Sequence, residues 1–470
     1  MKKNTISIAI GFGALILLVT GCAVHRSEPV SLTAPVPDTF NENPDAAAIG
    51  VYPDRWWEIF GDDTLNELMD KAFGANLDLA QAYSRLKQLE SVAKQSDALR
   101  YPTVNLDAGA SRDQLLNDPR TITGNVYNMS LAAAFEVDLW NKLKSGYQAR
   151  LLETGASLED IRSLYLTLSA QVTDLYFLRV EQRAQLELTD RTVTAREATV
   201  ELVEQRYVEG MVSALDVYQA RQALAAARSR RPVFEQNLAI ATYALSVLIG
   251  EYPDPESGGN LSHIPYVSEL FPTGLPSSIL TSRPDIQADL LRLKARDKEI
   301  GVAIADRFPS INLLADYGRY GSDFGPSLSG NLWGIAGNLM LPLIDWGRRK
   351  AEVERTQAAF QEQLDRYRQT VLIAFREVED ALVSNRKTEE QIGWLKDEET
   401  AADSALRLAS DRYLDGLSDY LPVLTAQGLF FDVQNRLLST RRQLVSNRVS
   451  LVRALGGNWM DVYIKERLDG

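Results

Sequence analysis

The chain has 470 residues, of which 45% are hydrophobic and 24% are charged, and this composition excludes bulk disorder. Fifty basic residues against 63 acidic residues give a net charge of -13, which excludes the basic surface of a nucleic-acid-binding protein. A single cysteine rules out an intrachain disulfide, and two histidines, His25 and His263, rule out a site built from several imidazoles and with it most zinc enzymes.

Residues 1–21 have the pattern of a secretory signal peptide. Two lysines precede the apolar run Ile8–Val19, which is too short to span a bilayer. The sequence Val19-Thr20-Gly21-Cys22 then resembles the lipobox of bacterial lipoproteins, and the following Ala23 resembles outer-membrane sorting. A plain signal with an incidental cysteine is the alternative, but Cys22 is the only cysteine and stands where the motif requires it. We therefore expect a lipid on Cys22.

Residues 22–54 are rich in Pro, Ser, Asn and Ala and predict an extended tether that joins the lipid to the first helix. No later stretch approaches eighteen consecutive apolar residues, so we expect no transmembrane helix after the signal.

A helix near 64–97 is followed by a predicted β-hairpin, about 101–140, with its loop at Asn117–Arg120. One face of each strand is apolar: Val104, Leu106, Ala108 and Ala110, then Tyr127, Met129, Leu131, Ala133, Phe135 and Val137. The other faces are small or polar. Long strands of this period suit a membrane barrel with lipid outside and water inside. A soluble sandwich is the alternative, but it needs more strands than the sequence contains.

After this hairpin, the spacing of apolar residues changes from every second residue to every third or fourth, as in a helix. Residues 142–208 contain no proline, only two glycines and many strong helix formers. At 1.5 Å per residue, an unbroken helix of this length would measure roughly 100 Å. A return helix is expected near 214–249, ending at Gly250, with a kink or a helix start at Pro232.

The second half of the chain repeats the first. Arg206-Tyr207-Val208-Glu209-Gly210 recurs 206 residues later as Arg412-Tyr413-Leu414-Asp415-Gly416, and Trp140 and Gly250 recur at the same offset as Trp346 and Gly456. The matching elements are a helix near 284–305, a hairpin about 308–346, and long helices near 348–414 and 419–455, with Pro422 as a kink or a start. The last strand is predicted to share one apolar face: Trp333, Ile335, Leu339, Leu341 and Leu343.

This repetition predicts a domain organisation of two repeats, 55–260 and 268–460, with long helices at about 142–250 and 348–456 and a C-terminal tail at 461–470. The fold class is mainly α with a transmembrane β-barrel, built from a duplicated unit of strand, strand and long helix hairpin. A barrel in lipid must close, and single-chain barrels start at eight strands. Four strands per chain therefore require a dimer with eight strands or a trimer with twelve.

Further motifs carry a family resemblance. Trp56-Trp57-Glu58-Ile59-Phe60-Gly61-Asp62, Arg283-Pro284-Asp285-Ile286 and Phe308-Pro309-Ser310-Ile311 occur in the order found in outer-membrane factors of the TolC type, in the lipoprotein branch with OprM, CusC and NodT. The chain resembles this family from Cys22 to about Trp459. The resemblance implies a homotrimer with a twelve-stranded β-barrel in the outer membrane of a Gram-negative-type bacterium and an α-helical barrel that extends through the periplasm.

The resemblance also implies the function. Such a protein is the passive exit duct of a tripartite efflux pump, together with a periplasmic adaptor and an inner-membrane transporter of the resistance-nodulation-division (RND) class. A duct for type I protein secretion and a non-conducting, lipid-anchored coiled-coil spacer are the alternatives. No catalytic motif, phosphate loop or cluster of metal ligands supports an enzyme, and we expect no cofactor or metal. Drugs, metal ions and lipophilic metabolites all remain open as cargo.

The two repeated turns are the candidate functional site. By resemblance they form the periplasmic tips that meet the adaptor, with Arg206, Tyr207 and Gly210 in the first and Arg412, Tyr413 and Gly416 in the second. Ordinary helix-hairpin turns are the alternative, because glycine ends a helix and reverses the chain wherever it stands.

The same turns supply the candidate gate, which consists of Tyr413, Asp415, Asp419, Asp216 and Glu209. Threefold symmetry would turn each acid into a ring of three like charges, which repel and which partners such as Arg206 and Arg412 can hold closed. Many family members carry a gate aspartate nine residues after the second tip glycine, where this chain has Thr425. Tyr101, Tyr127, Trp333 and Trp346 are candidates for an aromatic belt, although helix-junction packing is favoured for Trp140 and Trp346.

Overall fold

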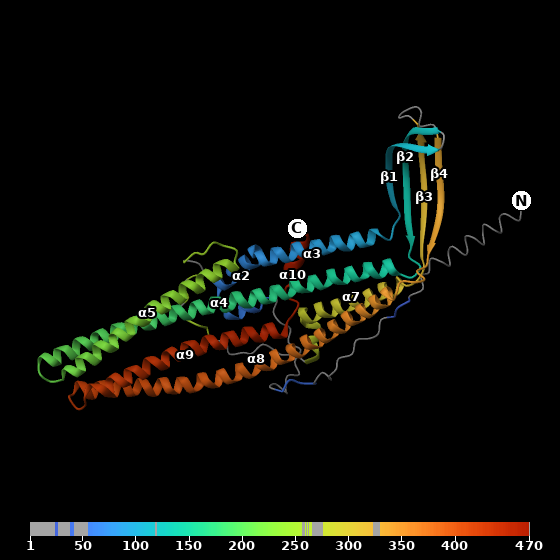
Figure 1. Ribbon diagram of the computed structural model, residues 1–470. Helices are drawn as coiled ribbons and strands as arrows, with labels where there is room; N and C mark the ends of the chain where they lie inside the picture. Colours follow the sequence, from blue (N-terminus) through green and yellow to red (C-terminus); the bar gives the residue numbers. More distant parts are fainter. Residues whose placement is uncertain are drawn as a thin grey trace. The chain divides into compact units, whose positions relative to one another are not determined.

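The computed structural model describes residues 24–26, 38–41, 55–117, 120–255, 259, 261, 263–265, 276–322 and 330–469. The signal peptide, Cys22 and parts of both predicted hairpin loops lie outside these residues. The described chain is mainly helical and contains one four-stranded sheet (Figure 1). Its elements follow in chain order: η1 (Trp56–Phe60), α2 (Asp63–Ala75), α3 (Leu77–Ala98), β1 (Thr103–Asn117), β2 (Arg120–Val137), α4 (Lys142–Val208), α5 (Ala214–Leu248), η2 (Pro276–Ser278), α6 (Ile279–Ser282), α7 (Pro284–Ala305), β3 (Ser310–Gly321), β4 (Gly330–Met340), α8 (Arg348–Leu414), α9 (Tyr420–Leu455) and α10 (Asp461–Asp469).

The chain forms two compact units, and each unit draws on both halves of the sequence. The first contains residues 84–159 and 287–369, and therefore the sheet. The second contains 34–83, 160–286 and 370–470, and therefore both helix hairpins. Because α4 and α8 each contribute to both units, the sequence repeats are not separate globular domains.

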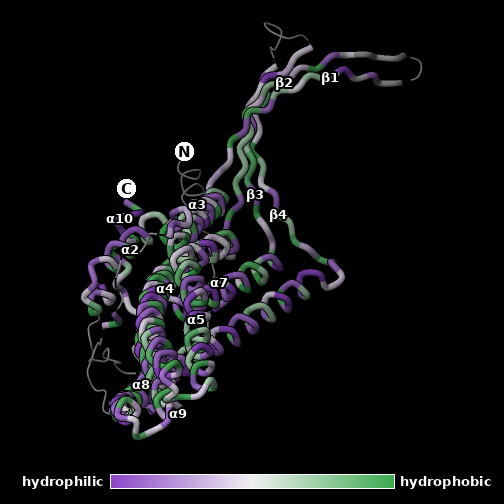
Figure 2. Tube along the Cα trace, turned by 90° about the vertical axis from the view of Figure 1, so that its left-hand side faces the viewer, coloured by the Kyte–Doolittle hydropathy of each residue, from purple (hydrophilic) through white to green (hydrophobic). Residues whose placement is uncertain are grey.

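The sheet has the order β1-β2-β3-β4, with all neighbours antiparallel. Its register pairs Thr103 with Ala134, Val137 with Ile311, and Ser310 with Met340. The predicted alternation is present, and Figure 2 shows hydrophobic and hydrophilic residues interspersed along the strands. Several apolar side chains of the predicted face are exposed, whereas Tyr127, Phe135 and Val137 are half-buried; the exposed ones are Val104, Leu106, Met129, Leu131, Trp333, Ile335 and Leu339. Within the described chain, β1 and β4 each pair along one edge only. An exposed apolar face with two open edges is a surface that requires a partner.

The long helices match the sequence prediction, since α4 and α8 each span 67 residues without a break. Pro232 lies inside α5, whereas Pro422 occupies the first turn of α9, where a backbone N–H has no partner within the helix. Among the described residues, no helix is both long and apolar enough to cross a bilayer.

The single helix predicted at 64–97 is wrong, because the chain breaks at Asn76 into α2 and α3. The Asn76 side-chain oxygen accepts from the backbone N–H groups of Asp78 at 2.9 Å and Leu79 at 3.0 Å, and so caps the start of α3. Its amide nitrogen donates to the carbonyl oxygen of Leu248 at 2.9 Å. An asparagine that satisfies two orphan donors favours a helix start over continuation.

The last predicted strand is too long. β4 ends at Met340, so Leu341 and Leu343 lie beyond it, next to Pro342, which has no N–H to donate to a ladder.

The sequence favoured packing at the helix junctions for Trp140 and Trp346, and the structure shows such packing for Trp140 alone. Its indole nitrogen donates to the carbonyl oxygen of Pro309 at 2.7 Å, while the Trp346 side chain is 96% exposed in the single chain.

In the second unit, aromatic packing joins the Trp56-Trp57 segment to the C-terminal segment that contains Trp459. Trp57 packs edge-on against Phe73 and Trp459, with ring centroids 5.6 and 5.3 Å away. Residues 461–469 form α10, and Arg467 donates to the carbonyl oxygen of Phe73 at 3.0 Å. The opening Trp56-Trp57 motif therefore lies in a core that also contains the C-terminal segment.

The described parts of segment 22–54 contact helices of their own units. In the first unit, the His25 ring nitrogen Nε2 lies 2.7 Å from a carboxylate oxygen of Asp297 in α7. In the second, Phe40 is buried, and the backbone N–H of Asn41 donates to Glu379 in α8 at 2.8 Å. These contacts fix two points of the predicted tether.

Candidate functional site: the helix-hairpin tips

Both tips have the geometry that their sequence predicts. Gly210 and Gly416 adopt φ values of 75° and 72°, in the left-handed region where glycine is unstrained, so each chain reversal follows directly on the end of α4 or α8. In the first tip, Ser213 and Asp216 form a reciprocal capping box that starts α5. The second tip lacks this box, because the Asp419 side chain at the start of α9 accepts no capping hydrogen bond.

The two tips meet through one arginine. The Arg206 guanidinium donates to the main-chain carbonyl oxygens of Tyr413 at 2.7 Å and Leu414 at 2.8 Å. Its central carbon also lies 4.6 Å from the centre of the Tyr413 ring. These carbonyls belong to the last turn of α8 and have no donor from within the helix. Arg206 therefore completes the C-terminus of α8 and joins the first hairpin to the second.

An apolar cluster lies under this contact, with members from both hairpins: Val203, Val217, Ala220, Tyr413, Tyr420 and Val423. The Tyr413 and Tyr420 rings are 5.8 Å apart. Burial raises the pKa of both hydroxyls above the usual range, although Arg206 acts against this at Tyr413 and Arg196 at Tyr420. Both tyrosines are therefore neutral, so Tyr413 adds no charge to a gate and acts through packing.

The remaining candidates are distributed around this cluster. Glu209 accepts from the side chain of Gln205 at 3.4 Å, and the Asp216 carboxylate accepts from the backbone of Ser213 at 2.9 Å. Asp415 and Asp419 are exposed. The Thr425 hydroxyl, at the usual gate position, donates to the Leu421 carbonyl at 2.9 Å. Two acids of the second tip are therefore free to form a charged ring, whereas Asp216 is used in capping.

Arg412 and Tyr207, the repeat counterparts of Arg206 and Tyr413, are not brought together. Both side chains are exposed, and within the described chain the Arg412 guanidinium has no hydrogen-bond or ion-pair partner.

Sequence reasoning missed Val203 and Tyr420, which are buried between the hairpins. Val203 lies about one helical turn before Arg206 on α4, and Tyr420 is the first residue of α9, but neither position shows which hairpin the side chain faces.

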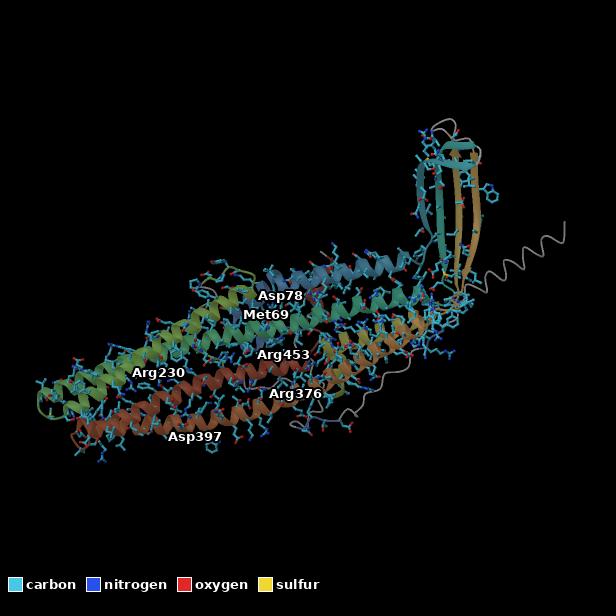
Figure 3. The ribbon with its side chains drawn as sticks, in the orientation of Figure 1. Met69, Asp78, Arg230, Arg376, Asp397 and Arg453 are labelled. Atoms are coloured by element: carbon cyan, nitrogen blue, oxygen red, sulfur yellow. The ribbon has the colours of Figure 1, made fainter. Side chains whose placement is uncertain are left out.

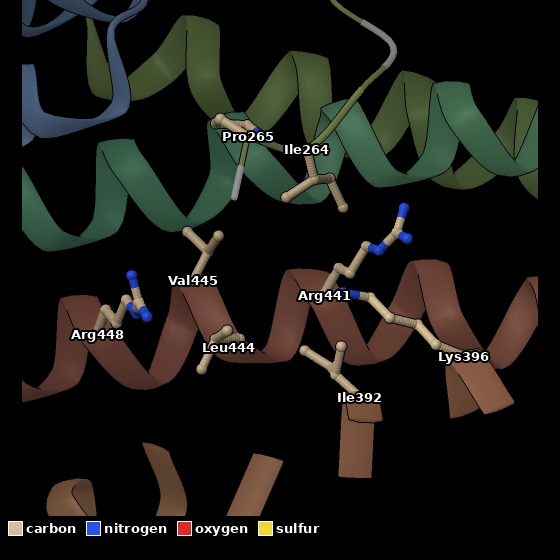
Figure 4. Close-up of a pocket in the computed structure, with 8 residues that line it drawn as sticks. All are labelled: Ile264, Pro265, Ile392, Lys396, Arg441, Leu444, Val445 and Arg448. Atoms are coloured by element: carbon tan, nitrogen blue, oxygen red, sulfur yellow. The ribbon is translucent and has the colours of Figure 1, made fainter. Parts of the chain in front are cut away.

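Away from the tips, charged side chains such as Arg230 and Asp397 project from the hairpins (Figure 3). A cavity of about 220 Å³ lies between α8, α9 and the Ile264–Pro265 segment (Figure 4). Lys396, Arg441 and Arg448 line it together with aliphatic side chains, and Arg448 pairs with Glu389 at 2.7 Å. No group of His, Cys, Asp and Glu in the described residues is arranged to hold a metal ion.

Residues 68–251 and 275–457 match the sequence model of the outer membrane efflux protein family. The chain belongs to this family. The match covers both repeats and confirms the resemblance that the motifs indicated. It places the chain in the outer membrane of a Gram-negative bacterium, as part of an efflux system.

Individual members show the same relationship over nearly the whole chain. The pyoverdine export outer membrane protein OpmQ of Pseudomonas aeruginosa is 30% identical over 86% of this chain and 87% of its own length. SilC of Salmonella typhimurium, a probable outer membrane lipoprotein, is 28% identical over 95% of this chain and 98% of its own. The open state of the MtrE outer membrane channel of Neisseria gonorrhoeae superposes with a TM-score of 0.83 at 26% identity, over 93% of this chain and 98% of its own.

Proposed function

We propose that the chain is the outer-membrane exit duct of a tripartite efflux pump and that it works as a homotrimer. The observation that carries this proposal is the four-stranded sheet, which has an exposed apolar face and two unpaired edges. An open sheet edge is not tolerated in lipid. Three copies would supply twelve strands and join β4 of one copy to β1 of the next, so that every edge is paired.

The helix hairpins supply the second part of the duct. At 1.5 Å per residue, the 67-residue helices α4 and α8 each measure about 100 Å. Arranged side by side in three copies, they would extend the channel into the periplasm as an α-helical barrel. The tips would then meet a periplasmic adaptor, and the adaptor would connect the duct to an inner-membrane transporter of the RND class.

The duct itself would catalyse no reaction and would contribute little to the choice of cargo. Transport energy would come from the inner-membrane transporter, and the duct would conduct cargo passively once its tips open. The named relatives serve different cargoes, since OpmQ is named for pyoverdine export and other relatives for toluene or solvent efflux. Drugs, metal ions and lipophilic metabolites all remain candidates for this chain.

The test of this function is conductance of the purified full-length protein in planar bilayers, with its mass in detergent measured in parallel. We expect a trimer that gives discrete, small currents because its tips are closed. A monomer that never inserts would contradict the duct and favour a lipid-anchored spacer. If the trimer conducts, co-purification with an RND transporter or with a type I secretion transporter would decide which system it serves.

A related prediction concerns the exposed acids of the second tip. The double variant Asp415→Asn, Asp419→Asn removes six negative charges from a trimeric tip. We expect its open probability to change severalfold, upward if the acids hold cations or arginines that close the tip. The double variant Glu187→Gln, Glu201→Gln is the control, because it neutralises two exposed acids of α4 that lie before the tip. Equal currents in all three proteins would exclude an acid gate.

We also propose that Cys22 carries the lipid, as the SilC relationship and the lipobox support. Mass spectrometry of the purified protein should show a chain that begins at Cys22 with added acyl mass. The variant Cys22→Ser should lose this mass, since a serine hydroxyl does not form the thioether. An unmodified Cys22 in the wild-type protein would contradict the lipid anchor.

A further inference from the structure

The two helix hairpins have equivalent positions, because α4 and α8 begin 206 residues apart and so do α5 and α9. In the second hairpin, Arg436 of α9 has two acidic partners. Its guanidinium pairs with Asp432, one helical turn earlier, at 2.9 Å, and also with Glu398 of α8. The charge of this arginine is therefore balanced by carboxylates of its own hairpin.

The first hairpin keeps the arginine and lacks both acids. Arg230 of α5 is the counterpart of the paired arginine (Figure 3), while Ala226 and Thr192 stand at the positions of the two acids. In addition, α4 has Arg196 where α8 has Ala402. Compared with the second hairpin, this place has two negative charges fewer and one positive charge more.

The two arginines of the first hairpin have no protein partner for their charge. Neither Arg196 nor Arg230 makes a hydrogen bond or an ion pair within the described part of the chain. The nearby arginines of α5 are paired: Arg228 lies 2.6 Å from Glu197, and Arg231 lies 2.9 Å from Asp190. The acids that could have balanced the two arginines are thus engaged elsewhere.

Electrostatics in this place disfavour two uncompensated cations. Burial lowers the pKa of the Arg196 guanidinium; Tyr420 acts against this effect, and the like charge of Arg230 lowers the pKa further. Arginine nevertheless stays protonated in proteins. The Arg196 guanidinium also lies 5.8 Å from the centre of the Phe431 ring, which restricts its position. An anion between the two guanidiniums would remove their repulsion.

A cavity provides the space for such an anion. It has a volume of about 270 Å³, lies between α4, α5 and α9, and is lined by both arginines. Small side chains leave this space, since α5 has Ala223 and Ala227 where α9 has Leu429 and Val433. Arg230 is exposed, so a ligand can enter from solvent. The cavity is large enough for a small polyatomic anion.

We propose that this cavity binds a phosphate group, of inorganic phosphate or of a small phosphate ester, between Arg196 and Arg230. Guanidinium groups bind phosphate oxygens through paired, charge-assisted hydrogen bonds. A phosphate group with two negative charges balances both arginines, whereas a single carboxylate balances one. Ala223 and Leu424 in the lining contact the organic part of an ester. This site lies within one chain and does not depend on the proposed duct.

Isothermal titration calorimetry of the full-length protein in a non-ionic detergent tests the site. The probes are inorganic phosphate and phenyl phosphate, in a chloride buffer of constant ionic strength. We expect one saturable site per chain. Tighter binding of phenyl phosphate assigns the site to an ester, and equal affinity assigns it to phosphate itself. If neither probe binds saturably, the proposal is overturned.

A pair of arginine variants tests which cation holds the ligand. Arg230→Gln should weaken phosphate binding roughly tenfold or more, because charge-assisted hydrogen bonds are lost. Arg228→Gln is the matched control, since it removes the same charge from the same helix, but Arg228 does not line the cavity. An equal loss in both variants would indicate attraction to the general charge of α5 and would overturn the site.

The variant Ala226→Asp restores one acid of the second hairpin. The new carboxylate would lie one turn before Arg230, as Asp432 lies before Arg436, and would compete with the ligand. We expect phosphate binding to weaken roughly tenfold and the unfolding midpoint without phosphate to stay at the wild-type value. Phosphate should raise the midpoint of the wild type but not that of the variant. Undiminished phosphate binding by this folded variant would contradict the site.

Discussion

Replacing Arg206 by alanine should open the duct. The variant loses two charge-assisted hydrogen bonds to the Tyr413 and Leu414 carbonyls and the contact with the Tyr413 ring. A hydrogen bond to a charged group contributes about 1.5–3 kcal/mol, with the lower value appropriate at a half-exposed site. Because solvent screens this site, we take about 1.5 kcal/mol for the two hydrogen bonds together, and a loss of that size shifts the balance between closed and open tips by roughly tenfold. Planar-bilayer recordings should therefore show a roughly tenfold higher open probability.

Arg221→Ala is the matched control. Arg221 pairs with Glu204 at 2.7 Å, but this ion pair joins α5 to α4 within one hairpin and both partners are exposed. Exposed pairs contribute little, typically below 1 kcal/mol. The control should behave as the wild type in the same bilayers. Equal currents from Arg206→Ala and the wild type would show that the contact between hairpins does not hold the tip closed.

Replacing Gly456 by alanine should strongly destabilise the second unit. Gly456 adopts φ 77°, and a Cβ atom there would lie 2.5 Å from the Ser282 carbonyl oxygen and 3.1 Å from the Arg283 Cα. Both are backbone atoms and cannot rotate away. The same junction holds hydrogen bonds from Gly457 N–H to Ser282 at 3.0 Å and from Arg283 to Ala454 at 3.0 Å. We expect a cost of about 3 kcal/mol or more from strain and displaced backbone together.

Gly416→Ala isolates the conformational part of this cost. Gly416 has a similar φ of 72°, but no atom lies within 4 Å of the position that its Cβ would occupy. It should lose only the left-handed preference, about 1 kcal/mol. Thermal unfolding followed by circular dichroism in detergent compares the two variants. Similar midpoints would mean that the close approach to Ser282 is not part of the folded state.

The sequence showed the candidate site as a pair of repeated turns. In the structure, the equivalent residues of the two turns have different contacts. Arg206 and Arg412 stand in nearly identical sequences, yet one caps a neighbouring helix and the other is exposed. No local rule separates them, because the difference arises from which hairpins lie side by side. Tyr413 was predicted as a gate residue, but its side chain is buried and packs in the tip cluster. Tyr207, which lies in a similar local sequence, is exposed.

The sequence by itself determined the elements whose causes are local. Helix-forming composition without proline set the bounds of α4 and α8, alternating residues set the faces of the strands, and glycines ended the helices at Gly210, Gly250, Gly416 and Gly456. The cap at Asn76 and the proline after β4 were also local signals, which the sequence reasoning overlooked. Only the tertiary structure decided the hydrogen bond from Asn76 to Leu248 and the exposure of Trp346, since each depends on neighbours distant in sequence. The pairing of β2 with β3 and of Arg206 with Tyr413 belongs to the same class, because a repeated sequence specifies equivalent surfaces but not which copy of each surface comes into contact.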